Sequence, residues 1–116
     1  MNKKNTLFHK AARKTVREFP VSVRSVVAQA LSDAEVGDLN PCAKPLKGFG
    51  GAGVIEIVDR FDGCAYRVVY TTKIKDVICV VHAFKKKSPR GSQVPQRDME
   101  VIKKRLKAAA AEYDGK

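Results

Sequence analysis

The sequence contains no tryptophan, only two histidines and only three cysteines, and these shortages argue against several classes of protein. The cysteines are odd in number and show no CxxC spacing, which argues against a disulfide framework and against a zinc site. No stretch approaches the roughly 20 apolar residues of a membrane span, and the N-terminus lacks the apolar run of a signal peptide. We therefore expect a reduced, cytoplasmic protein with no membrane partner, no metal and no cofactor.

Acidic residues are also scarce, because 12 Asp and Glu stand against 23 Lys and Arg. The formal net charge is +11 and the sequence pI is about 9.8. Such an excess favours nucleic acid or another polyanion as a partner and says nothing about the fold. With 116 residues and 44% hydrophobic content, the chain is expected to form a single domain over residues 1–116.

The N-terminal third of the chain predicts two helices. A short basic helix is expected over Ala11–Glu18, with Pro20 ending it. A second helix is expected from Ser22 to about Val36, because its apolar residues recur on one helical face and Gly37 follows as a stop signal. Ahead of both, Thr6–His9 is a possible edge strand.

A small antiparallel sheet is expected in the middle of the chain, after a loop over Asp38–Gly53. β-Branched residues and short turns predict a meander of three strands, Val54–Phe61, Tyr66–Thr72 and Val77–Phe84. A last helix is expected from Pro95 to about Glu112. The predicted fold class is α+β, with two N-terminal helices, this meander plus the possible edge strand, and one C-terminal helix.

The strongest candidate site is at one end of the second hairpin. Because antiparallel strands place the start of one beside the end of the next, Arg67 is expected near Lys85 and Lys86. Arginine holds phosphate bidentately, so we assign charge stabilisation to Arg67 and Lys86 and proton transfer to Lys85. Glu56 is either a base or a group that orients Arg67. Strand alternation leaves open which sheet face is covered.

RNA cleavage without a metal uses the 2′-hydroxyl as the nucleophile and needs a proton acceptor, a proton donor and positive charge on the phosphorane. His82 is a candidate for the acid–base work, although a structural position in its strand explains it equally well. Further phosphate contacts are expected from the basic side chains of the loops, the strand end and the last helix: Lys47, Lys87, Arg90 and Lys104.

Five segments, read in order from Arg17 to Lys107, resemble phage-related HigB-type toxins of the RelE superfamily. They are FP–VR–V–AL, LKGFGGAG, AYRVVY, VVHAFKKKS and P–R–MEVIKKRLK. The resemblance implies a RelE-like fold and a ribosome-dependent mRNA endoribonuclease. It also implies neutralisation by a co-expressed helix-turn-helix antitoxin of the HigA type, with DNA contacted only through the antitoxin complex.

The resemblance also bears on individual residues. It implies that Arg67, and Lys85 or Lys86, contact the scissile phosphate. Relatives commonly carry a basic residue where this chain has Val58, and Arg60, two positions on and on the same strand face, is the expected substitute.

Two other functions remain open at this point. One is that of the ParE branch of the same superfamily, whose members poison DNA gyrase and are not nucleases. The other is a non-catalytic basic nucleic-acid-binding relic of the toxin fold. Cleavage of mRNA, trapped gyrase–DNA complexes, or salt-sensitive binding with neither outcome would separate the three functions.

Overall fold

The computed structural model describes residues 3–49, 53–87 and 93–114, apart from the side chains of the last two. In these ranges the chain forms three helices and five strands. The elements follow in the order β1 (Asn5–Phe8), α1 (Lys10–Arg17), α2 (Val21–Glu35), β2 (Ala43–Pro45), β3 (Val54–Phe61), β4 (Cys64–Thr71), β5 (Val77–Lys86) and α3 (Gln96–Asp114).

The sheet is mixed and has the strand order β1-β5-β4-β3-β2. Strands β3, β4 and β5 form the predicted antiparallel meander. The sheet has five strands in the described ranges, so the expected number, three strands plus one possible N-terminal edge strand, is wrong. β1 pairs with β5 in parallel, and the short strand β2 pairs with β3 at the other edge. The helix layout gives no clear support to the RelE-like arrangement that the resemblance implied.

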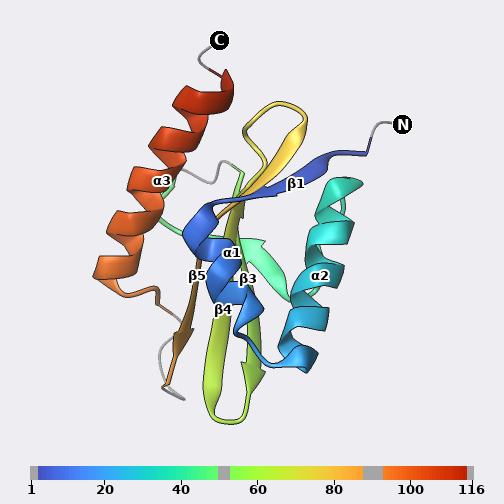
Figure 1. The fold of residues 1–116 in the computed structure, drawn as a ribbon, viewed down its shortest axis with the longest axis vertical. Helices are drawn as coiled ribbons and strands as arrows, with labels where there is room; N and C mark the ends of the chain where they lie inside the picture. Colours follow the sequence, from blue (N-terminus) through green and yellow to red (C-terminus); the bar gives the residue numbers. More distant parts are fainter. Residues whose placement is uncertain (1–2, 50–52, 88–92, 115–116) are drawn as a thin grey trace.

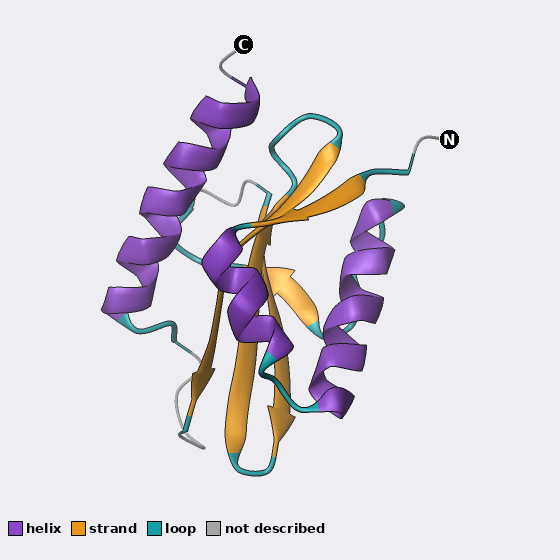
Figure 2. Cartoon of the chain, in the orientation of Figure 1, coloured by secondary structure: helices purple, strands orange, loops and turns teal. Residues whose placement is uncertain are grey.

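The helices cover opposite faces of the sheet. Figure 1 shows α2 and α3 on the two sides of the strands, with α1 in front of them. One hydrophobic core lies under α1 and α2 and includes Val23, Val27, Tyr66 and Val68. A second core lies under α3 and includes Val69 and Ile102 among its members. The β3–β4 hairpin extends beyond the helices at the lower end of the molecule (Figure 2).

An irregularity in β5 determines which of its residues face α3. Val69 of β4 pairs with His82, whereas the next residue, Tyr70, pairs with Val80, so Val81 is an extra residue in the strand. This is a β-bulge, which locally breaks the alternation of side chains. As a result Val81 packs in the core under α3, and His82 faces the same side.

None of the three helices in the described ranges has the length and apolarity needed to cross a lipid bilayer.

α2 shows why these helices are packed on the sheet. Its residues at helical spacing, among them Ala30, Leu31 and Ala34, are buried in the first core. The helix ends just before Gly37, whose φ of 88° suits a residue without a Cβ atom.

His9 joins β1 to α1 and caps the helix. Its Nδ1 accepts a hydrogen bond from the backbone N–H of Ala11 at 3.1 Å, which satisfies one of the free donors at the helix start. Desolvation lowers the pKa of His9 below its ordinary value of 6.5, and electrostatic interactions with Arg105 and His82 lower it further. Protonation of His9 is therefore easier in the unfolded chain than in the folded protein.

This difference predicts a pH-dependent effect of the substitution His9→Asn. Asparagine is a preferred N-cap residue and does not titrate, so the cap is retained. The stabilising contribution of neutral His9 is present above the unfolded-state pKa of 6.5 and is lost as the pH falls below that value toward the lower folded-state pKa. Urea unfolding across this range should show that His9→Asn loses less stability on acidification than the wild type. Identical losses in the two proteins would contradict the prediction.

Candidate functional site

Five of the ten predicted site residues lie on the sheet face that α3 covers, in three rows that run across the strands. Residues paired across antiparallel strands share a face, so the register defines each row. The rows are Lys44–Glu56–Val69–His82, then Val58–Arg67–Phe84, and then Arg60–Ala65–Lys86. The topology therefore brings Glu56, Arg67, His82, Lys86 and Arg60 to one face, with Lys44 of β2 beside them.

Arg67 and Glu56 form a buried ion pair. Arg67 Nη1 donates to Glu56 Oε2 at 2.7 Å, and the two residues are 0% and 2% exposed. This burial does not fit the direct phosphate contact that was expected of Arg67, because its guanidinium is not exposed to solvent. An unpaired guanidinium is costly under a covering helix, so its charge is compensated by a carboxylate on the neighbouring strand.

Lys85 and Lys86 point to opposite faces of the sheet. Lys85 pairs with Tyr66 and projects toward the side of α1 and α2, whereas Lys86 pairs with Ala65 on the side of α3. Successive residues of a strand must alternate in this way, so the expected convergence of both lysines with Arg67 is wrong for Lys85. Lys86 Nζ lies 3.4 Å from the carbonyl oxygen of Gln93, in the segment that leads into α3.

A cavity of about 450 Å³ opens between β2, β3 and the start of α3. Glu56 lines it, together with Lys44, Lys47, Gln93 and Gln96. Lys44 Nζ lies 4.0 Å from Glu56 Oε1, and the lysine side chain is 56% exposed. The cavity is thus lined by one carboxylate, which is paired with Arg67, and by the solvent-accessible side chains of Lys44 and Lys47.

His82 links β5 to α3. Its Nε2 lies 2.7 Å from Asp98 Oδ1, and its Nδ1 lies 3.2 Å from Arg105 Nη1. Because a guanidinium can only donate, Nδ1 is the acceptor, and the ring proton on Nε2 is donated to Asp98. Arg105 also donates to the carbonyl oxygen of Val81 in the bulge at 3.0 Å. Both ring nitrogens are thus engaged within the protein, which favours a structural role, and a catalytic one stays a prediction.

The remaining predicted RNA contacts are dispersed. Lys47 lies at the cavity, Arg60 is exposed at the far end of β3, and Lys87 is exposed just after β5. Lys104 is exposed on α3. Arg90 lies outside the described residues. The structure therefore groups Lys47 with Glu56 and separates the others from it.

Sequence reasoning missed Lys44, Asp98 and Arg105. Lys44 sits in β2, a three-residue strand ending in Pro45, which has too little length or alternation to predict a strand. Asp98 and Arg105 lie on α3 seven positions apart, a spacing that places them on one helical face. That spacing was the available signal for a contact with a single residue of the sheet.

None of the three cysteines lines the cavity at Glu56, because Cys79 is buried in the core under α3 and Cys42 and Cys64 pack against the core under α1 and α2. Burial raises the pKa of the Cys79 thiol, and the nearby Glu112 raises it further, so the reactive thiolate is disfavoured. Within residues 3–49, 53–87 and 93–114, no three His, Cys, Asp or Glu side chains are grouped so that they could hold a metal ion. The independence of the chemistry from metal stays a prediction.

Comparison with known proteins identifies a family for this chain. The family model described as phage-derived protein Gp49-like (DUF891) matches residues 14–107, a span from α1 into α3 that includes Lys44, Glu56, Arg67 and Lys86. Neither a search of curated proteins nor a search of solved structures finds a match.

Proposed function

This chain belongs to the phage-derived Gp49-like family, which lies within the RelE/ParE-like toxin superfamily, and from that premise we propose that it is a HigB-type toxin that cleaves mRNA on the ribosome. In this proposal it is the toxin of a type II toxin–antitoxin system in the cytoplasm. A co-expressed helix-turn-helix antitoxin of the HigA type neutralises it and makes the complex's contacts with DNA.

The observation that supports this proposal best is the cavity beside Glu56. Its carboxylate is fixed by a 2.7 Å ion pair with Arg67, and Lys44 and Lys47 stand at the same cavity. A phosphate in the cavity would meet two ammonium groups, and the adjacent 2′-hydroxyl would meet a carboxylate. Positive charge and a proton acceptor at one place are what RNA cleavage through the 2′-oxygen requires.

In the proposed reaction, Glu56 accepts the proton of the 2′-hydroxyl, and the 2′-oxygen forms a bond to phosphorus. The bond between phosphorus and the 5′-oxygen breaks, which leaves a 2′,3′-cyclic phosphate and a 5′-hydroxyl. Lys44 stabilises the negative charge on the phosphorane, and Lys47 gives a proton to the departing 5′-oxygen. Arg67 acts through Glu56 as a positioning residue, which replaces the phosphate contact expected from the sequence.

The same geometry supports a dependence on the ribosome. Glu56 is almost fully buried, and the lysines at the cavity have long, exposed side chains. Because such side chains do not hold a substrate in one position, the protein alone does not align the 2′-hydroxyl with the phosphate. Holding the reacting atoms in line is worth several powers of ten in rate. A toxin with this site gains most from a partner that presents the mRNA strand in a fixed conformation.

The test compares translating mRNA, naked mRNA and supercoiled plasmid with gyrase in a bacterial extract. We expect cuts in translating mRNA, almost none in naked mRNA, and unimpaired supercoiling. Lys47→Gln should slow the cleavage by about 10²-fold or more, because it removes the group that gives a proton to the departing 5′-oxygen. Lys75→Gln, the same charge change at an exposed site in the β4–β5 turn, should leave the rate unchanged.

Two results would contradict the proposal. Rapid cutting of naked RNA would show that the ribosome is not needed. Trapped gyrase–DNA complexes without RNA cleavage would assign the chain to the ParE type of activity.

A further inference from the structure

The solvent-facing side of α1 carries a row of cations that the proposed reaction does not use. These cations are Lys10, Arg13, Lys14 and Arg17. On a helix of 3.6 residues per turn, the four residues fall within an arc of about 100° and span about 10 Å along the axis. Ala12, on the opposite side, is buried against the sheet. We name this row the basic face of α1, and it consists of Lys10, Arg13, Lys14 and Arg17.

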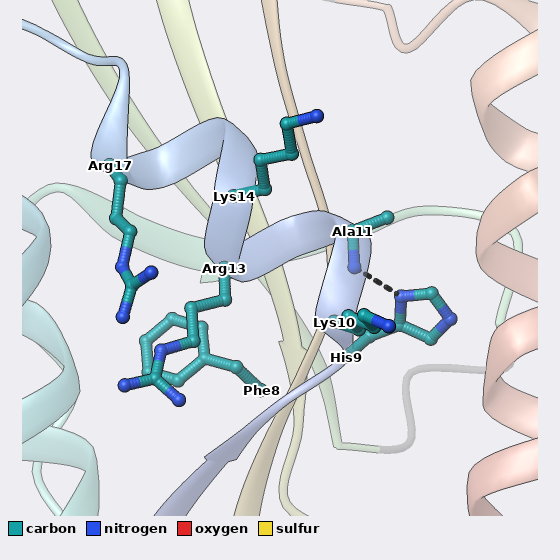
Figure 3. A pocket seen from close by; sticks show the side chains of 7 residues that line it. All are labelled: Phe8, His9, Lys10, Ala11, Arg13, Lys14 and Arg17. Atoms are coloured by element: carbon teal, nitrogen blue, oxygen red, sulfur yellow. Dashed lines mark hydrogen bonds between the residues drawn. The ribbon is translucent and has the colours of Figure 1, made fainter.

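A groove of about 840 Å³ runs along the basic face of α1. Phe8 and His9 line it together with the four cations. Figure 3 shows the side chains of Arg13 and Arg17 extending to the same side of the helix, where Phe8 lies. The groove therefore presents two adjacent guanidinium groups beside an aromatic ring.

The charges of this face are not compensated within the described part of the chain. No carboxylate there forms an ion pair with any of the four cations, and the first turn of α1 holds no acidic residue. Lys10 and Lys14, and likewise Arg13 and Arg17, are four residues apart, a spacing at which like charges destabilise a helix. A bound polyanion would relieve this repulsion.

The basic face of α1 lies on the opposite side of the sheet from the cavity at Glu56. α1 packs in the core shared with α2, whereas the cavity lies on the side of α3. Lys85 also projects to the side of the sheet where α1 lies, and its ammonium group adds to the positive charge of that side. The groove and the cavity share no lining residue, so a ligand of α1 is treated as a segment distinct from the strand in the cavity.

We propose that the basic face of α1 binds the phosphate backbone of folded RNA. The inference extends the proposed function, because a toxin seated on the ribosome with mRNA in its cavity would meet ribosomal RNA on its other side. Phosphates of a helical backbone recur regularly, as do the cations of α1, and guanidinium groups hold phosphate bidentately. The groove offers side-chain donors in a row rather than the free strand edge that an extended acidic peptide would use.

The test measures binding of a short RNA duplex of mixed sequence over a range of KCl concentrations. Arg13→Gln/Arg17→Gln should weaken binding by about tenfold at moderate salt and reduce the slope of log K against log salt by nearly two. Lys73→Gln/Lys75→Gln removes the same charge from the exposed β4–β5 turn and should change the binding little. Thermal unfolding should show that both double variants remain folded.

Equal losses in the two double variants would overturn the inference, since the binding would then reflect net charge alone. The same assay is run with polyglutamate as the ligand. If Arg13→Gln/Arg17→Gln loses binding to polyglutamate but keeps its binding to RNA, the inference is overturned and the face is assigned to an acidic protein. The outcome is separable from the proposed function. A wild type that cuts no mRNA but binds duplex through α1 disproves the nuclease alone. Cleavage with duplex binding unaffected by Arg13→Gln/Arg17→Gln disproves the α1 site alone.

Discussion

Replacing Arg67 with methionine is expected to lower the free energy of unfolding by about 3–5 kcal/mol. The substitution removes the guanidinium that lies 2.7 Å from the Glu56 carboxylate and leaves that carboxylate buried with only the more distant Lys44 nearby. An uncompensated buried charge is among the most destabilising outcomes of a single substitution. Chemical denaturation followed by circular dichroism measures the loss.

The double variant Arg67→Met/Glu56→Leu is the matched control. Both charges are then absent and side chains of similar volume fill the site, so most of the lost stability should return. A loss below about 1 kcal/mol in Arg67→Met would show that the pair is more hydrated than its burial indicates. The expected destabilisation of Arg67→Met also changes how toxicity assays must be interpreted, because an inactive Arg67→Ala protein is then expected to be a destabilised one.

Replacing Glu56 with glutamine is expected to slow mRNA cleavage by about 10²–10⁴-fold. The amide keeps an oxygen that can accept the hydrogen bond from Arg67, but it cannot take up the proton of the 2′-hydroxyl. The rate is measured from the appearance of cut mRNA in a translating extract, at a temperature where denaturation curves show that the variant is folded.

Glu56→Asp provides the comparison for this variant. It keeps the carboxylate but shortens the side chain by one methylene, so it should retain more activity than Glu56→Gln. Cleavage by Glu56→Gln at the wild-type rate would show that the carboxylate serves only to compensate Arg67. The acid–base role would then have to be sought elsewhere in the cavity, beginning with Lys44 and Lys47.

The sequence predicted those elements whose pattern is long and regular. The helices of the structure begin and end within about two residues of the expected bounds, and the meander of β3, β4 and β5 is present. β2 was missed because a three-residue edge strand ending in Pro45 has no readable period. The parallel pairing of β1 with β5 joins segments some seventy residues apart, as in Asn5 with Val77, and local patterns contain no information about it.

For the site, strand alternation correctly predicted which residues share a face, and it could not predict what covers that face. Arg67 and Lys86 share a side of the sheet, but Arg67 is fully buried and β3 supplies Glu56 as its partner. Both lysines were expected close to Arg67, although Lys85 necessarily points away from Lys86. Lys44 entered the site only through β2, the strand that the sequence did not reveal.

The bulge at Val81 adds a residue to β5 without deciding which side of the sheet the two lysines face. Without Val81, Val80 would still pair with Tyr70 and His82 with Val69, which is the regular alternation of an antiparallel ladder. Deleting Val81 would therefore remove a side chain from the core under α3 and leave Lys85 and Lys86 in their present orientations. The strand can lose this residue and keep its pairing, so the bulge is a place where the length of β5 can change without reorienting the end of the strand.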